Sequence, residues 1–123
     1  MKVLDLAKRY NQFQNNVGQF VEVDIDHIVA TLFAESFRKI ANGTTLVAKR
    51  SDLKNQLMIL RDQSGKWTIE PKEEVVFQDT MRCLIRYHLI SANYGLFDVM
   101  ATLRANSDDL IEEVDEIYYK VAS

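Results

Sequence analysis

The chain has 123 residues, of which 47% are hydrophobic, and its 18 acidic and 15 basic residues leave a net charge of −3. This length and composition fit one globular domain with its own core and exclude a disordered or fibrous chain. The single cysteine, Cys83, excludes an intrachain disulfide framework and a multi-cysteine zinc site, and the net charge is too small to indicate a polyanionic partner.

Residues 1–23 predict an amphipathic helix, because apolar side chains recur there at alternating spacings of three and four residues. The members of this stripe are Val3, Leu6, Tyr10, Phe13, Val17 and Phe20. A stripe of this kind is a candidate seam for a homodimer. The polar side chains between its members, including Asn11 and Gln14, are expected to face solvent.

A second helix is expected between residues 24 and 43. Asp24 or Asp26 can cap its start, a broad apolar stripe runs from Ile25 to Ile40, and Gly43 can end it. The N-terminal residues become charged and polar too early for a signal peptide, and no apolar run is long enough to span a bilayer. We therefore expect a cytoplasmic protein with no membrane partner.

Residues 44–70 admit two interpretations. As a helix, the segment begins near Asp52, aligns leucines 53, 57 and 60 on one face, and ends at Gly65. As strands, residues 57–61 and 66–70 flank a turn and form a small antiparallel β-hairpin near 57–70. Periodicity alone does not decide between them.

Residues 72–92 predict a central buried helix, opened by Pro71 and ended by Asn93 and Gly95. On a helical wheel apolar side chains cover nearly all sides, and His88 points into the larger apolar face as a neutral core histidine. Further helices are expected over 96–105 and 107–123. The predicted fold is therefore mostly α: a single domain over residues 1–123, with five or six helices bundled around residues 72–92.

Arg82 and His88 have five residues between them. The pair resembles the motif of the HEPN group of helical ribonucleases, in which a histidine follows an arginine after four to six residues. The resemblance covers these two residues, the expected helical content and the chain length. It implies a helical ribonuclease in which both residues are catalytic. Six positions on one helix leave the two side chains about 120° apart, so a dimer seam would have to bring two copies together.

Two groups of residues have metal-binding character. The sequence DIDH over residues 24–27 offers two carboxylates and an imidazole, but helix capping accounts for the aspartates. Glu112, Glu113 and Glu116 have a spacing that resembles the magnesium ligands of helical nucleotide pyrophosphatases, without the second acidic pair of those enzymes. A solvated acidic face is the favoured interpretation, so we expect no metal and no cofactor.

Charge is unevenly distributed along the chain. Residues 38–72 hold eight bases and three acids, whereas residues 98–123 hold seven acids and two bases. These regions can neutralise each other within the fold or meet across subunits, or the basic region can contact a phosphate backbone. The candidate binding-surface residues are Arg38, Lys39, Lys49, Arg50, Lys54, Trp67, Glu112, Glu113, Asp115 and Glu116.

The favoured function is a non-enzymatic protein-interaction module: a small regulator, inhibitor, adaptor or immunity-type protein acting through helical faces and segregated charge. Its expected partner is another protein or a second copy of the chain as a homodimer. No catalytic residue is assigned in this interpretation, because no phosphate-binding loop or nucleophile motif is present. The alternatives are a HEPN-like ribonuclease using Arg82 and His88, and a weak nucleic-acid binder using residues 38–72.

Overall fold

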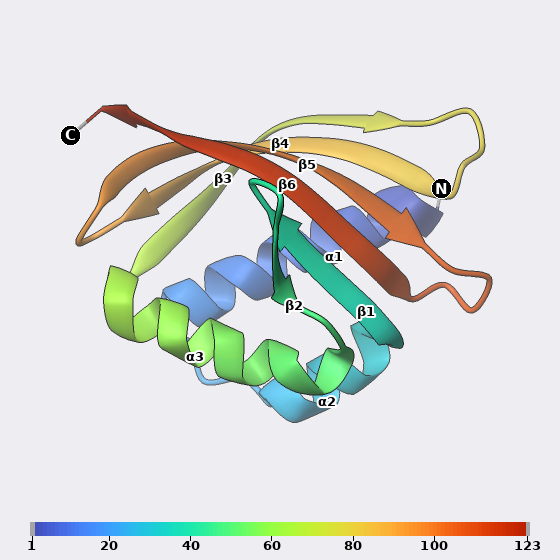
Figure 1. Cartoon of the computed structure of the whole chain (residues 1–123), viewed down its shortest axis with the longest axis horizontal. Coiled ribbons are helices and arrows are strands. Elements are labelled where there is room, and N and C mark those ends of the chain that lie inside the picture. Colours follow the sequence, from blue (N-terminus) through green and yellow to red (C-terminus); the bar gives the residue numbers. More distant parts are fainter. Residues whose placement is uncertain (1, 123) are drawn as a thin grey trace.

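The protein folds as a strongly curved β-sheet with helices packed against its inner side (Figure 1). The computed structural model describes residues 2–122. Its elements in chain order are α1 (Lys2–Gly18), α2 (Ile25–Leu32), β1 (Phe33–Ala41), β2 (Thr44–Val47), the 3-10 turn η1 (Arg50–Asp52), α3 (Leu53–Ser64), β3 (Trp67–Val76), β4 (Arg82–Ser91), β5 (Gly95–Ala105) and β6 (Ile111–Ala122).

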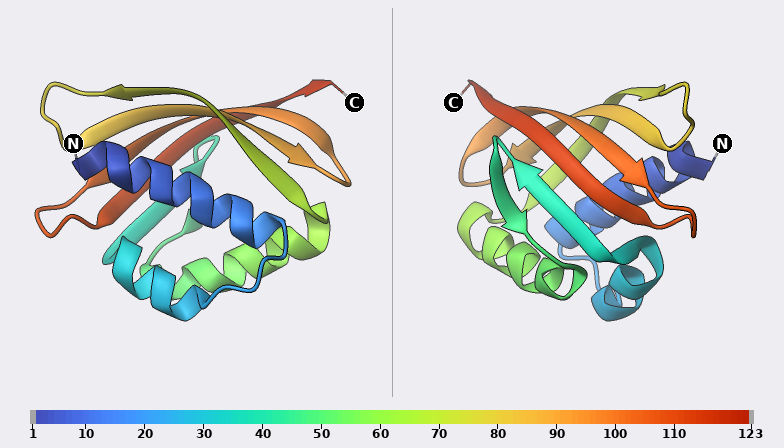
Figure 2. Two further views of the ribbon diagram at one scale, coloured as in Figure 1. Left: turned by 180° about the vertical axis from the view of Figure 1, so that it is seen from behind. Right: turned by 45° about the vertical axis from the view of Figure 1, so that its right-hand side comes forward.

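Over residues 2–122 the sheet has six strands in the order β2-β1-β6-β5-β4-β3. Neighbouring strands are antiparallel except β1 and β6, which run parallel. The last strand therefore lies between the first strand and β5. Figure 2 shows α1 lying along the inner side of the sheet, with α2 and α3 closing the layer below it.

The predicted mostly α bundle is wrong, and the segment expected to be its central helix shows why. Residues 72–92 form the end of β3, a turn and β4. Cys83, Ile85 and Tyr87 point inward from β4, and Leu84 and Ile90 on its outer face are also apolar. A strand with apolar residues on both faces can resemble a buried helix on a helical wheel. Pro71 lies at a register shift in edge strand β3, where proline is tolerated.

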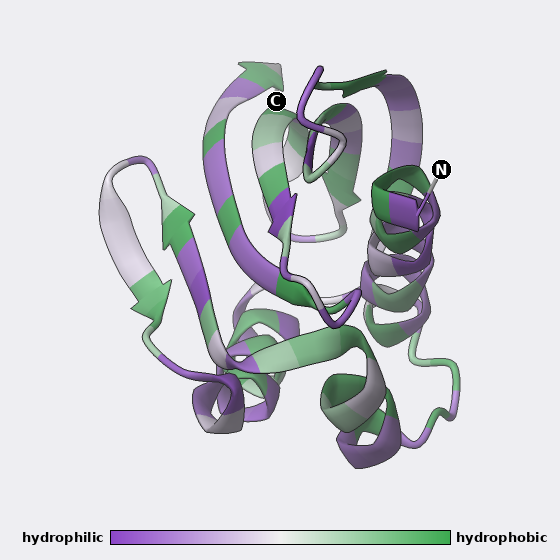
Figure 3. Cartoon of the chain, turned by 90° about the vertical axis from the view of Figure 1, so that its right-hand side faces the viewer, coloured by the Kyte–Doolittle hydropathy of each residue, from purple (hydrophilic) through white to green (hydrophobic). Residues whose placement is uncertain are grey.

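Three other segments that were expected to be helical also differ from the prediction. Residues 96–105 and 107–123 contribute strands β5 and β6 rather than helices, and the second helix ends at Leu32, where the chain continues directly into β1. Figure 3 shows hydrophilic and hydrophobic residues alternating along the strands, as a sheet with one buried face requires. The hairpin near 57–70 is also wrong, because residues 53–64 are helical and β3 pairs with β4 instead.

Several expectations are confirmed. The first amphipathic helix corresponds to α1. Asp24 caps α2, because its carboxylate accepts a hydrogen bond of 3.1 Å from the backbone N–H of His27. The helical interpretation of residues 53–64 is correct, and Gly65, with a φ of 65°, ends α3.

The apolar stripe of α1 packs into the core of its own chain rather than facing a second one. Five of the six candidate seam residues are buried: Val3, Leu6, Tyr10, Phe13 and Val17. Phe20 follows the helix and is exposed. Tyr10 and Phe13 contact the ring of Phe33 at the start of β1. The stripe therefore holds α1 against the sheet.

The C-terminal half of α1 is fixed to edge strand β3. The indole Nε1 of Trp67 donates a 3.0 Å hydrogen bond to the backbone carbonyl of Gln14, and the Asn15 side chain accepts one of 2.8 Å from the N–H of Ile69. The buried Trp67 ring lies directly against Gly18, so closely that a Cβ at this position would overlap it. Gly18 is therefore required for close approach of helix and strand.

We expect Gly18→Ala to lower the free energy of unfolding by about 1–3 kcal/mol, because the ring and the helix would have to separate. Urea denaturation followed by circular dichroism measures this change. Gln12→Ala, on the exposed face of the same helix, is the matched control and should change stability little. An unchanged urea midpoint for Gly18→Ala would contradict the close packing.

Candidate functional site

A cavity of about 330 Å³ lies between α1, α3 and the inner face of the sheet. Much of its wall is apolar, formed by Leu46, Leu60, Leu89, Phe97, Val99 and Tyr118. Polar side chains also line it, among them Gln14 of α1, Lys39 of β1, Tyr87 of β4 and Glu116 of β6. A mostly apolar chamber with a few converging polar groups is typical of a small-molecule site.

Strand alternation places the two charged groups inside the protein. Lys39 follows the buried Phe37 by two residues on β1, and it is only 4% exposed. Glu116 on β6 is 8% exposed and lies in register with Ala41 of β1 and Ala101 of β5. These small neighbours leave room for the carboxylate above the sheet.

Tyr87 extends the polar group toward β4. Its hydroxyl donates a hydrogen bond of 3.3 Å to Oε2 of Glu116. Burial, and secondarily the Glu116 charge, raise the pKa of Tyr87 well above its ordinary value. The phenol therefore stays protonated at neutral pH and holds the carboxylate in place.

Helix α1 adds Tyr10 and Gln14, which lie one turn apart and both face the sheet. The Tyr10 ring centroid lies 5.9 Å from Nζ of Lys39. The buried Tyr10 hydroxyl and Gln14 Nε2 make no hydrogen bond of ordinary geometry in the described part of the chain. Polar groups nevertheless lie close to both, Lys39 beside Tyr10 and Tyr87 beside Gln14. Gln14 and Asn11 were expected to face solvent, yet both are buried. Buried donors that make no hydrogen bond of ordinary geometry are available to a ligand.

The charge on Lys39 is maintained by its neighbours. Burial lowers the pKa of this amine, but the attraction of Glu116 and Tyr10 exceeds that effect, and the net result is a raised pKa. Among the ion pairs of residues 2–122, none joins Lys39 to Glu116. An ammonium and a carboxylate thus line one chamber without direct pairing, and a ligand group can approach both.

Three of the candidate binding-surface residues lie in the interior: Lys39, Trp67 and Glu116. Arg38 and Glu113 remain on the outside, 3.9 Å apart, because β1 and β6 are neighbours. The basic and acidic regions thus neutralise each other here within the fold, which is one of the alternatives that the sequence leaves open.

The remaining surface candidates are scattered around the molecule. Arg50 pairs with Glu35, Lys54 with Asp26, and Glu112 with Arg104, at 3.6, 3.2 and 3.3 Å. Lys49 and Asp115 are exposed. These residues surround the fold and do not form one patch with the cavity residues.

Arg82 and His88 do not form a joint site. Both are on β4, and six residues along a strand correspond to roughly 20 Å. Arg82 binds Asp79 at 2.7 Å, whereas Nε2 of His88 lies 3.9 Å from Oδ1 of Asp98. His88 is on the outer face of the sheet, so its expected place in a helical core is wrong. The HEPN resemblance also required a helical chain.

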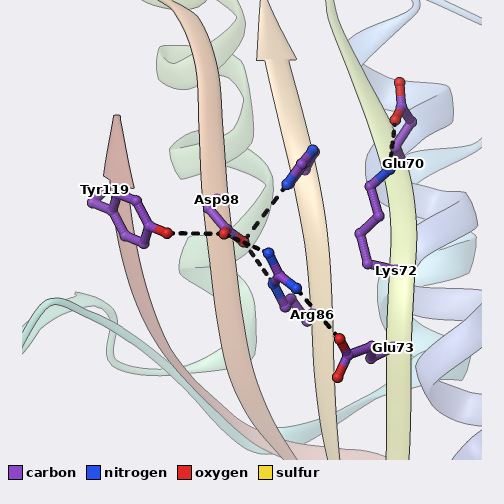
Figure 4. A network of polar contacts seen from close by, with 7 residues as sticks. Glu70, Lys72, Glu73, Arg86, Asp98 and Tyr119 are labelled. Atoms are coloured by element: carbon purple, nitrogen blue, oxygen red, sulfur yellow. Dashed lines mark hydrogen bonds and ion pairs between the residues drawn. The ribbon is translucent and has the colours of Figure 1, made fainter. Parts of the chain in front are cut away.

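Asp98 is the centre of a polar network on that outer face (Figure 4). Its carboxylate accepts hydrogen bonds from Nε and Nη2 of Arg86, at 3.0 and 2.8 Å, and one of 3.0 Å from the Tyr119 hydroxyl. Arg86 also donates to Glu73 at 3.3 Å. The Arg86 hydrogen bonds lower the pKa of Asp98 to about 2. The network links β3, β4, β5 and β6 across the sheet.

Metal and membrane features were searched in the described part of the chain. Over residues 2–122, no group of three or more His, Cys, Asp and Glu side chains is arranged to hold a metal ion. No helix in this range has the length and hydrophobicity needed to cross a bilayer. Burial raises the pKa of the Cys83 thiol on β4.

No family model matches the sequence, and no curated protein matches it. Solved structures do share its fold. A SnoaL-like protein from Agrobacterium tumefaciens, described as a candidate isomerase, has a TM-score of 0.74 at 14% identity and covers 97% of this chain and 98% of its own. An NTF2-like protein of unknown function from Cytophaga hutchinsonii has a TM-score of 0.67 at 11% identity, with 96% of each chain covered.

A third structure is SalBIII, an epoxide hydrolase/cyclase-like enzyme with a role in pyran ring formation in the polyether salinomycin. It has a TM-score of 0.68 at 15% identity and covers 96% of this chain and 91% of its own. At these identities the likeness concerns the fold. The chain thus has the α+β fold of NTF2-like and SnoaL-like proteins.

We expect the free energy of unfolding of Asp98→Asn to fall less than that of the wild type when the pH is lowered into the acid range. The folded-state pKa of about 2 lies below the ordinary value of 3.8. The stabilisation by the carboxylate is therefore complete above about pH 4 and is lost as the pH falls toward 2. Urea denaturation between about pH 2 and 6 should show a smaller decline for Asp98→Asn than for the wild type.

Asp115→Asn removes an exposed carboxylate of the neighbouring strand and serves as the control. It should keep the wild-type decline. Parallel pH profiles for Asp98→Asn and the wild type would show that the Arg86 pair does not lower the Asp98 pKa.

Proposed function

We propose that this protein is an enzyme that moves a proton at a carbon atom next to a carbonyl group, in a small and largely apolar ligand held in the cavity. Isomerisation and ring closure are the reaction classes that follow from such a step. The observation that carries the proposal is the convergence of the Glu116 carboxylate and the Lys39 ammonium on one chamber, with the buried Tyr10 ring 5.9 Å from the Lys39 Nζ.

Glu116 is the proposed general base. Its carboxylate lines the chamber and is oriented by the hydrogen bond from Tyr87. A base buried on a strand is held rigidly, which favours proton abstraction from a weakly acidic C–H group. The same residue returns the proton to another carbon of the ligand and completes an isomerisation.

Lys39 and Tyr10 are the proposed stabilisers of the oxygen anion that forms when the carbon is deprotonated. An ammonium that remains charged inside the protein and a hydroxyl that makes no hydrogen bond of ordinary geometry are donors already in place before the reaction. Gln14 adds a third donor from the next turn of α1. In this proposal these groups bind the carbonyl oxygen of the ligand.

The comparisons support this class of reaction without identifying the substrate. One structure of the same fold is described as a candidate isomerase and another as a cyclase-like enzyme. The predicted regulator and protein-binding roles rested on a helical bundle and have no support in this fold. A second copy of the chain as partner, and nucleic-acid binding by residues 38–72, stay predictions that no observation tests.

We expect Glu116→Gln to lower the rate of catalysed proton exchange by roughly 10²–10⁴-fold, because an amide is not a general base. The probe is 1-tetralone in D₂O, whose protons next to the carbonyl exchange for deuterium and are followed by NMR. Glu113→Gln, on the same strand but facing outward, should exchange at the wild-type rate. A folded Glu116→Gln variant with wild-type exchange would overturn the role of Glu116.

Tyr10→Phe separates function from stability. Because the Tyr10 hydroxyl makes no hydrogen bond of ordinary geometry, its removal should change the free energy of unfolding by less than about 1 kcal/mol. Loss of one donor to the oxygen anion should slow tetralone exchange by roughly 10²–10³-fold. A loss of stability without a loss of exchange would assign Tyr10 to packing alone. Thermal unfolding and the NMR exchange rate, measured on the same sample, distinguish the two results.

A further inference from the structure

The cavity continues into a second hollow. This outer chamber, of about 570 Å³, lies between β2 and α3 and reaches Tyr118 of β6. It shares five lining residues with the inner chamber: Leu46, Gln56, Leu60, Gln63 and Tyr118. Leu46 and Tyr118 are 42% and 40% exposed, so the shared residues mark the way from solvent to the inner chamber.

Among these shared residues, Gln56 has a buried side-chain oxygen that makes no hydrogen bond within the described residues. It lies on α3 next to the buried Leu57. An apolar side chain would avoid the cost of leaving a buried amide unpaired. No contact within residues 2–122 accounts for this polar atom, and both chambers open onto the side chain that bears it.

We propose that Gln56 is a specificity-determining residue that binds a second polar group of the substrate, of the hydroxyl type. This inference rests on the proposed function, which places a carbonyl group at Lys39. The substrate class is then a hydroxylated carbonyl compound, with the two oxygen groups separated by an apolar framework. The carbonyl end faces the inner donors, and the hydroxyl end faces the junction of the two chambers.

Two features of the chamber select this class. Leu60, Leu89 and Phe97 are among the apolar residues of the inner chamber, which suits a ring system or hydrocarbon and not a chain of polar groups. Gln56 is neutral, so it compensates no charge on the ligand. A hydroxyl both donates and accepts hydrogen bonds, and it therefore pairs with an amide whichever end the amide presents.

A pair of ligands that differ by one hydroxyl tests the inference. We expect 6-hydroxy-1-tetralone to bind the wild-type protein about tenfold more tightly than 1-tetralone, measured by isothermal titration calorimetry. Gln56→Leu should bind the two ligands with equal affinity and should unfold at the same or a higher temperature. Gln12→Leu makes the same chemical change on the exposed face of α1, outside both chambers, and should keep the preference.

The outcome of this test is independent of the proposed reaction. Equal binding of the two ligands by the wild type, a preference that survives in Gln56→Leu, or no binding of 6-hydroxy-1-tetralone would overturn the role of Gln56. Deuterium exchange on the same ligands addresses the reaction separately. A preference that depends on Gln56 but is accompanied by no exchange would support this inference and overturn the proposed proton transfer.

Discussion

The buried charges of Lys39 and Glu116 are the constraint on which this structure depends. Neither group would be stable alone in an apolar interior, because an uncompensated buried charge is costly. The parallel pairing of β1 with β6 brings them into one chamber, where the attraction keeps Lys39 protonated. The phenols of Tyr10 and Tyr87 complete a polar centre inside a hydrophobic shell. Such a centre lowers the stability of the core, a cost that the proposed function would explain.

The sequence predicts the helices of this fold better than its strands. The stripe of α1, the cap at Asp24 and the end of α3 at Gly65 follow local rules, and each is correct. The strands were missed because the alternation of apolar and polar residues is interrupted in them: β4 carries Leu84 and Ile90 among the polar residues of its outer face, and β6 carries Glu116 on its inner face. A local signal for one hairpin was present, since Asn42 and Gly43 both have positive φ between β1 and β2, as an Asn-Gly turn favours.

The candidate site could be predicted only in fragments. Lys39 and Glu116 were selected for their charge and assigned to a surface, whereas strand alternation places them inside. The pattern of the first helix assigns Tyr10 to the core and Gln14 to solvent. No local rule indicates that either residue lies near Lys39, which follows them by 25 or more positions. Their convergence follows from the order of strands in the sheet, which depends on contacts between distant segments.

The central position of β6 has a consequence for how the protein is made. This strand is synthesised after the other five, yet it joins β2 and β1 to β5, β4 and β3. Until it is synthesised the sheet consists of two unconnected parts, each with an open edge beside the gap, and the carboxylate that faces Lys39 does not exist. Pairing over such sequence separations is slow. The pairing of β6 is therefore a late event that joins the two parts of the sheet, completes the hydrophobic core and brings Glu116 into the chamber of Lys39.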